Sequence, residues 1–118
     1  MVVDDSLGVR QIVSFIVKNS GYDVVEAVDG LDAMTKLESQ PSLSLIITDL
    51  HMPRLDGIGL IRGVRKHKTH GLIPIIIITT ESDDMRRTEG EEAGATDWIP
   101  KPFRPEQLME AITKVLAQ

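Results

Sequence analysis

Leu45-Ile46-Ile47-Thr48-Asp49-Leu50-His51-Met52-Pro53-Arg54-Leu55-Asp56-Gly57 is the stretch of sequence that decides the fold. An apolar run ends abruptly on a carboxylate, and a proline and an Asp-Gly pair follow closely. A short apolar run bounded by turn residues is typical of a fully buried strand. Asp49 is then expected at the carboxyl end of that strand, where open parallel sheets place their ligands. Taken alone, Asp49 is explained equally well as the first residue of a turn.

The composition predicts one small globular domain that spans residues 1–118. The chain is 26% charged and 42% hydrophobic, which is ordinary for such a domain. Its net charge of −5 argues against nucleic acid or an anionic membrane as a partner. The absence of cysteine excludes disulfides and thiol catalysis and fits the reducing cytoplasm. No signal peptide opens the sequence, and the longest apolar run, around 75–78, is too short to span a bilayer.

Strand-like runs alternate with helical patterns along the whole chain. The strand-like runs lie at residues 1–3, 22–27, 43–48, 73–80 and 96–100. Helical patterns lie between Ser6 and Gly21, at 31–38, at 58–64, at 83–93 and from Pro105 onward. Five strands that alternate with five helices predict an α/β fold, with a parallel sheet, helices on both faces and right-handed crossovers.

Three segments carry expectations about packing. The first helix should bury one apolar face, made by Val9, Ile12, Val13, Ile16 and Val17. The helix at 83–93 has little apolar content and an internal Gly90, so it should be the least stable helix. The basic stretch 65–71 is interpreted as a solvated helix end in preference to a binding patch.

The strand ends predict a chemical site, because the carboxyl ends of parallel strands share one edge of the sheet. The residues left at this edge are Asp4 and Asp5, Asp49, Thr79 and Thr80, and Lys101. Three neighbouring carboxylates require a cation, and hard oxygen ligands suit Mg²⁺. With the metal bound, Asp49 can act as a nucleophile that forms an acyl phosphate. The metal, Lys101 and the Thr79 hydroxyl would then stabilise the phosphoryl oxygens.

Each of these residues also has a plainer explanation. Asp4 and Asp5 could simply favour the start of the following helix, and Thr79 could be an ordinary β-branched strand residue. Lys101 could be a solvated lysine before a proline. The His51 ring is a poor candidate for a zinc ligand, since a single imidazole beside carboxylates is unusual for zinc. These explanations account badly for the joint placement of the residues on successive strands.

The chain resembles the receiver domains of two-component response regulators, and among them the stand-alone chemotaxis regulators of the CheY type. The matching pieces are Val3-Asp4-Asp5-Ser6, the Asp49 to Gly57 stretch, Thr79-Thr80-Glu81-Ser82, Gly94-Ala95-Thr96-Asp97-Trp98-Ile99 and Lys101-Pro102-Phe103. Their order and spacing fit the family over essentially the whole chain. The resemblance implies a flavodoxin-like (βα)5 three-layer sandwich with a five-stranded parallel sheet of order 2-1-3-4-5.

The resemblance also implies roles for the site residues. Asp49 would accept phosphate from the phosphohistidine of a sensor histidine kinase. Asp5, Asp49 and the backbone carbonyl of His51 would ligate Mg²⁺ directly, with Asp4 nearby or acting through water. Lys101 would pair with the phosphoryl group and be followed by a cis peptide bond to Pro102.

Switching and output follow from the same resemblance. Thr79 would move to bond the phosphoryl group, after which Trp98 would reorient; the plainer role of Trp98 is that of a half-buried packing residue. Side chains at His51 and Glu81 would influence dephosphorylation. The fourth helix, fifth strand and last helix would present an output face to a protein target, such as a flagellar motor switch protein. The expected state is a monomer or weak dimer that assists its own phosphorylation and dephosphorylation and is not a conventional turnover enzyme.

Two functions of other classes remain open at the level of sequence. One is a Mg²⁺-dependent phosphatase with an Asp nucleophile, although no second acid lies near Asp49 and the chain has no cap insertion. The other is a docking module of the same fold that is never phosphorylated. The intact acidic pair, Thr79 and Lys101 argue against this second alternative.

Overall fold

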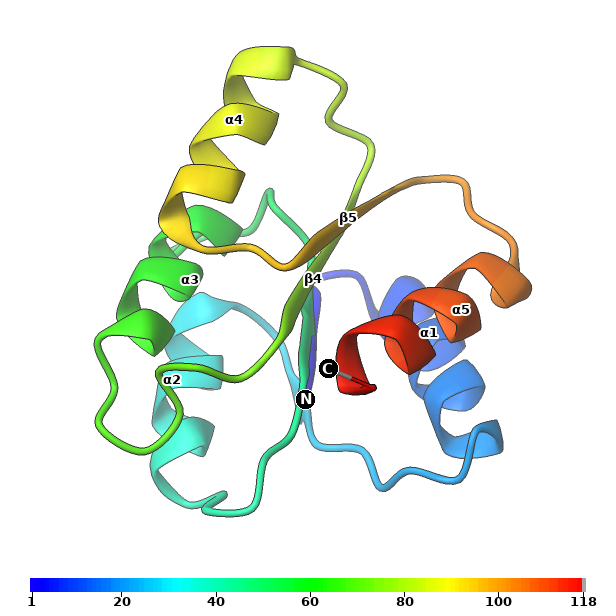
Figure 1. The fold of residues 1–118 in the computed structure, drawn as a ribbon, viewed down its shortest axis with the longest axis horizontal. Coiled ribbons are helices and arrows are strands. Elements are labelled where there is room, and N and C mark those ends of the chain that lie inside the picture. The colour runs from blue at the N-terminus through cyan, green and yellow to red at the C-terminus, as the bar shows by residue number, and fades with distance from the viewer. Residues whose placement is uncertain (118) are drawn as a thin grey trace.

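Five parallel strands form one sheet in the order β2-β1-β3-β4-β5, with helices on both faces (Figure 1). The computed structural model describes residues 1–117. The strands are β1 (Val2–Val3), β2 (Glu26–Ala27), β3 (Ile46–Thr48), β4 (Ile75–Thr79) and β5 (Asp97–Pro100). The helices are α1 (Leu7–Asn19), α2 (Gly30–Glu38), α3 (Gly57–Arg65), α4 (Asp84–Ala93) and α5 (Pro105–Leu116). The predicted flavodoxin-like fold and its strand order are confirmed.

The sheet separates two apolar cores, because alternate side chains of a strand point to opposite faces. Along β4, Ile75 and Ile77 pack into one core, whereas Ile76 and Ile78 pack into the other. Helices α2, α3 and α4 lie on the first side, and α1 and α5 lie on the second (Figure 1). All five residues of β4 are buried, which explains why its sequence is continuously apolar up to Thr79.

The helices begin and end where their capping residues predict. The side chains of Ser6, Asp29, Asp56 and Asp83 accept backbone N–H groups at the starts of α1 to α4. After α1, Gly21 adopts a φ of +92°, the left-handed conformation that ends a helix most easily in glycine. Capping residues therefore mark where α1 to α4 begin and where α1 ends.

The strands are shorter than predicted. The run 22–27 contributes only Glu26–Ala27 to the sheet, and the run 43–48 contributes Ile46–Thr48. The physical reason is pairing: β2 lies at the edge of the sheet and pairs with the two residues of β1 alone. Residues without an opposite partner have no ladder to join, whatever their β propensity.

One expectation about burial is wrong, and a second holds only in part. The sequence predicts Ile12 on the buried face of α1, but it is 59% exposed and lines an open apolar groove together with Phe15 of α1 and Met109 of α5. The basic stretch 65–71 is not simply a solvated helix end, since His70 is buried and Arg65 is half-buried. The Arg65 guanidinium donates to the carbonyls of Gly94, Gly71 and Ile73 at 2.6–3.1 Å. This side chain thus joins the end of α3 to the turns before β4 and β5.

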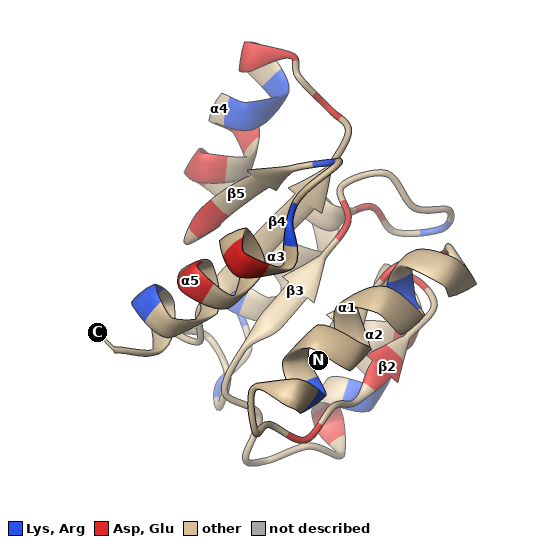
Figure 2. Ribbon diagram, turned by 90° about the vertical axis from the view of Figure 1, so that its right-hand side faces the viewer, with Lys and Arg blue, Asp and Glu red and all other residues tan. Residues whose placement is uncertain are grey.

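Helix α4 buries little of its own surface and is joined to its neighbours by ion pairs as well as by the packing of Gly90. Within Asp84–Ala93, Gly90 alone is buried, and Figure 2 shows acidic and basic residues along the helix. Arg86 pairs with Asp56 at 3.5 Å, and Glu89 pairs with Arg62 of α3 at 3.8 Å.

Among the helices described in residues 1–117, none has the length and hydropathy that a membrane span needs.

Candidate functional site

The carboxylates of Asp4, Asp5 and Asp49 meet at the carboxyl edge of the sheet. One oxygen from each lies within 4.8 Å of the others. The sheet ladder causes this convergence, because the Asp49 N–H donates to the Val3 carbonyl at 3.0 Å just beyond β3. Asp4 is buried, Asp49 is half-buried and Asp5 is exposed, so the cluster opens to solvent on one side. The predicted acidic cluster is therefore present.

Lys101 bridges two of these carboxylates. Its Nζ lies 3.2 Å from Asp4 Oδ2 and 3.3 Å from Asp49 Oδ2, and all three side chains are at most 16% exposed. The Lys101 N–H donates to the Thr79 carbonyl at 2.9 Å, so the backbone of Lys101 lies beyond β4 and its side chain reaches over the end of that strand to the acids. The peptide bond to Pro102 is cis, as the resemblance implies. The ammonium thus compensates charge on both Asp4 and Asp49.

The environment of Asp4 disfavours its charged form. Burial raises the pKa of the Asp4 carboxyl, and the Asp49 carboxylate acts in the same direction. The Ser6 N–H, 2.8 Å from Asp4 Oδ1, and the Lys101 ammonium oppose this rise in the pKa without cancelling it. A further cation at this position would relieve the same penalty.

Sequence reasoning missed Arg10, which fixes the backbone of the acidic pair. Its Nη1 donates to the Asp4 carbonyl at 2.8 Å, and its Nε pairs with Glu26 of β2 at 3.1 Å. The sequence shows only that a charged residue lies in the first turn of a largely apolar helix. Its partners were not readable from the sequence, because Glu26 becomes a neighbour only through the β1–β2 pairing.

The donor set of the cluster fits a hard divalent cation. Three carboxylates supply oxygen ligands only, and Mg²⁺ prefers oxygen over nitrogen or sulfur. One side of the cluster is exposed, which suits an ion that keeps some of its water. The participation of the His51 carbonyl stays a prediction.

Thr79 is fully buried at the end of β4. Its hydroxyl oxygen accepts the Glu81 N–H at 3.2 Å. The hydroxyl is therefore held by the loop that follows β4. Thr79 pairs in the sheet with Pro100, the residue before Lys101. Movement of Thr79 toward a phosphoryl group stays a prediction.

His51 and Glu81 lie together at the mouth of the site. The His51 Nε2 atom is 3.4 Å from Glu81 Oε1, and the histidine side chain is 55% exposed. The two residues come from the loops that follow β3 and β4. The structure therefore brings together the two residues that the resemblance links to dephosphorylation.

Trp98 lies apart from the acidic cluster, in the core beneath α4. The residue is 9% exposed, so it is more buried than the half-buried packing residue considered from the sequence. A Cβ atom built on Gly90 would lie 3.2 Å from Trp98 Cζ3, and the Arg87 guanidinium lies 5.9 Å from the ring centroid. The indole thus already occupies an inward position, packed against the backbone of α4.

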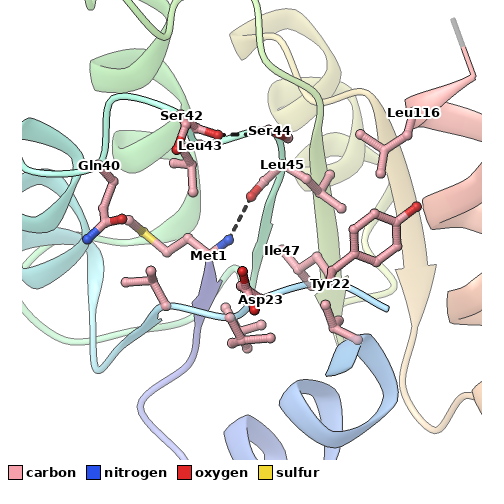
Figure 3. A pocket seen from close by; sticks show the side chains of 14 residues that line it. Met1, Tyr22, Asp23, Gln40, Ser42, Leu43, Ser44, Leu45, Ile47 and Leu116 are labelled. Carbon is pink, nitrogen blue, oxygen red and sulfur yellow. Dashed lines mark hydrogen bonds between the residues drawn. The ribbon is translucent and has the colours of Figure 1, made fainter. Parts of the chain in front are cut away.

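A pocket at the opposite end of the sheet, where the strands begin, contains none of the predicted site residues (Figure 3). It is lined mostly by apolar side chains, including Val17, Leu43 and Leu45. Met1 and Leu45 precede β1 and β3, so the pocket lies at the amino ends of the strands. The chemistry of the domain is therefore concentrated at the carboxyl edge.

Known proteins are similar to this chain in both sequence and architecture. The response regulator receiver domain family matches residues 1–113. Chemotaxis protein CheY1 of Helicobacter pylori is 38% identical over 98% of this chain and 94% of its own length. Probable transcriptional regulator ycf27 of Porphyridium aerugineum is 39% identical, but this chain spans only 47% of it. The crystal structure of chemotaxis protein CheY4 of Vibrio cholerae has a TM-score of 0.92 and 37% identity, and the match covers 98% of this chain and 95% of that one.

Proposed function

Because the chain belongs to the response regulator receiver family, we propose that it is a single receiver domain, residues 1–118, that accepts a phosphoryl group on Asp49. The donor would be the phosphohistidine of a sensor histidine kinase. The observation that carries the proposal is the contact of Lys101 with Asp49 and Asp4 at 3.3 and 3.2 Å. This contact places an ammonium where negative charge would develop on the transferred group.

The proposed transfer uses groups that are already in place. An Asp49 carboxylate oxygen attacks phosphorus, the P–N bond breaks, and the released imidazole keeps the electron pair of that bond. Lys101 neutralises the charge of the transferred group, and the Thr79 hydroxyl leaves the Glu81 N–H to donate to a phosphoryl oxygen. Asp4, Asp5, Asp49 and the His51 carbonyl would hold Mg²⁺, whose charge would stabilise the carboxylates and the phosphoryl oxygens.

The proposed output is a change in the face made by α4, β5 and α5, which a downstream protein would recognise. Trp98 and Thr79 would couple this face to the site, and His51 and Glu81 would set how fast the phosphate is lost. The similarity to chemotaxis proteins CheY1 and CheY4 supports a role in chemotaxis. We further propose that the domain acts in the cytoplasm and that its target is a flagellar motor switch protein. A similar stretch also makes up 47% of a probable transcriptional regulator, so domains of this kind are not restricted to chemotaxis proteins.

Intact-mass spectrometry tests the proposal directly. With Mg²⁺ and acetyl phosphate, the wild type should gain the mass of one phosphoryl group, and hydroxylamine should remove it. The matched variant Asp49→Asn keeps the shape of the side chain but lacks the nucleophile, so its mass should not change. A hydroxylamine-labile gain in the Asn variant would refute the assignment of Asp49.

The same samples separate the alternative functions. A phosphatase would release phosphate from small esters over many turnovers, whereas a receiver domain should be modified once per chain. A docking module without phosphorylation would show no change in mass under any of these conditions. Stoichiometric, hydroxylamine-labile modification without ester turnover is the result expected for a regulator.

A further inference from the structure

Arg54 adopts an unusual backbone conformation in the loop between β3 and α3. Its φ is +69°, within the left-handed region that residues other than glycine rarely occupy. A long charged side chain has no local means of stabilising this conformation, unlike asparagine or aspartate. Interactions with the surrounding structure must therefore hold the residue in place.

The partner of Arg54 is Asp29, which precedes α2. The Nε and Nη2 atoms of Arg54 both donate to Asp29 Oδ2, with Nε at 2.7 Å. Asp29 is only 3% exposed, and its other oxygen accepts the Asp32 N–H at 2.8 Å and so caps α2. This bond chiefly, with a contribution from Arg54, lowers the pKa of the Asp29 carboxyl despite its burial. The pair is therefore charged and joins the loop to the start of a rigid helix.

Backbone contacts attach the same loop at both ends. The Gly30 N–H donates to the Leu55 carbonyl at 3.2 Å, and the Gly57 N–H donates to the Leu50 carbonyl at 2.8 Å. No side chain fits at either glycine, because a Cβ would lie 2.5 Å from the Leu55 oxygen or 2.4 Å from the Asp49 oxygen. Between these two attachments, the Arg54 side chain links the loop to α2. Asp49 and His51 are on the segment that these contacts restrain.

We infer that Arg54, through Asp29, is a positioning residue that holds the loop of residues 49–56 in the arrangement in which its oxygen ligands bind Mg²⁺. This role rests on the proposed function and extends it to a residue outside the acidic cluster. Groups that orient metal ligands are often worth about tenfold in affinity or more. Arg54 would act in this way from the distal end of the loop, with no contact to the ion.

The inference is tested by titrating Mg²⁺ alone into the full chain, without a phosphodonor. Amide NMR shifts of Asp4, Asp5 and Asp49 report the dissociation constant, and thermal unfolding reports stability. Arg54→Gln should weaken Mg²⁺ binding about tenfold. Asp29→Asn keeps a good capping residue for α2 but removes the charge, so it should have a similar effect. The double variant should bind no more weakly than either single variant, because both changes break one pair.

Three controls separate positioning from other effects. Arg62→Gln removes an exposed arginine from α3 without touching the loop, and its affinity should stay within twofold of the wild type. Val115→Ala lowers stability from a buried site on α5 and should likewise leave affinity unchanged. Arg54→Gly relieves the backbone conformation without restoring the pair, so it should bind as weakly as Arg54→Gln.

Phosphorylation with acetyl phosphate gives a second, independent readout. Arg54→Gln should need about tenfold more Mg²⁺ for half-maximal rate, yet approach the wild-type rate at saturation. Wild-type affinity in Arg54→Gln, or equal weakening in Val115→Ala, would overturn the inference. If the wild type binds Mg²⁺ but never gains phosphate, the proposed function fails, and the dissociation constants still decide the role of Arg54.

Discussion

Asp4 shows how the chemistry of the site opposes the stability of the fold. Its carboxyl has a pKa above the ordinary value of 3.8 because it is buried, close to Asp49 and only partly compensated by Lys101. The folded state therefore binds this proton more tightly than the unfolded chain does. The contribution of Asp4 to stability is complete below pH 3.8 and is lost as the pH rises through the folded-state value.

Asp4→Asn should consequently stabilise the metal-free protein at neutral pH. The amide can still accept the Ser6 N–H but carries no charge, so we expect a higher melting temperature, by roughly 4 °C for each kcal/mol gained. The gap from the wild type should narrow as the pH falls toward the ordinary range of carboxyl groups. Melting followed by circular dichroism in a chelating buffer measures this, with the exposed Asp23→Asn as the control. A gap that widens toward acid would show that the sign is wrong.

Gly90 is the second residue at which a small change should have a defined effect. A Cβ there would meet Trp98 Cζ3 and Ile77 Cδ1, both at 3.2 Å. Alanine in place of glycine gains about 1 kcal/mol in helix propensity, but overpacking a core contact costs about 1–3 kcal/mol. We therefore expect Gly90→Ala to be neutral or destabilising and to push the indole outward.

Trp98 emission and its quenching by acrylamide measure that displacement. The spectrum of Gly90→Ala should shift to longer wavelength, and quenching should increase. Gly8→Ala is the matched control, since a Cβ at Gly8 meets nothing within 4 Å. An unchanged spectrum in Gly90→Ala, at wild-type stability, would mean that α4 yields and the ring does not.

At the scale of elements, α4 should be the part of the domain that opens most easily. Apart from the packing of Gly90 on Ile77 and Trp98, it is held by ion pairs to Arg62 and Asp56, and exposed pairs contribute roughly 0–1 kcal/mol each. Salt screens such pairs, whereas the burial of β4 is insensitive to moderate salt. The amides of α4 should therefore exchange faster than those of β4, and exchange should accelerate in high salt for α4 alone.

Hydrogen exchange resolved by peptide or by NMR tests this order. Arg86→Gln should accelerate exchange in α4 at low salt and remove most of its dependence on salt, with Arg104→Gln as a control outside the interface. Exchange in α4 as slow as in β4 would remove the physical basis for treating this helix as the mobile part of the output face.

At the scale of the whole molecule, alternation of strands and helices was enough to predict the fold class, because each pattern reports how one segment buries its own side chains. The acidic cluster was predictable for the same reason, since parallel strands bring Asp4, Asp5 and Asp49 to one edge. The strand order came from resemblance. Strand lengths were overestimated because pairing depends on the neighbouring strand and not on local propensity, as β2 shows.

Polar contacts between distant segments were not predictable. Arg65, Arg10 and Arg54 each donate to groups that are remote in sequence or that depend on the exact path of a turn. The sequence around a charged residue does not indicate which distant group that residue will contact. The inward position of Trp98 was missed for a related reason, since the space for its ring is made by the missing side chain of Gly90 on another element.

Lys101 contacts residues at the carboxyl ends of three strands: Asp4 after β1, Asp49 after β3 and Thr79 of β4. Its ammonium therefore affects the binding of any other cation at this site. Because the ammonium already neutralises Asp4 and Asp49, we expect it to compete with Mg²⁺ for these carboxylates and to lower the affinity of the wild type for the ion. Lys101→Ala should therefore bind Mg²⁺ more tightly than the wild type and yet accept phosphate more slowly. Lys66→Ala, an exposed lysine at the end of α3, should change neither property. Weaker Mg²⁺ binding in Lys101→Ala would show that the lysine organises the carboxylates and does not compete for them.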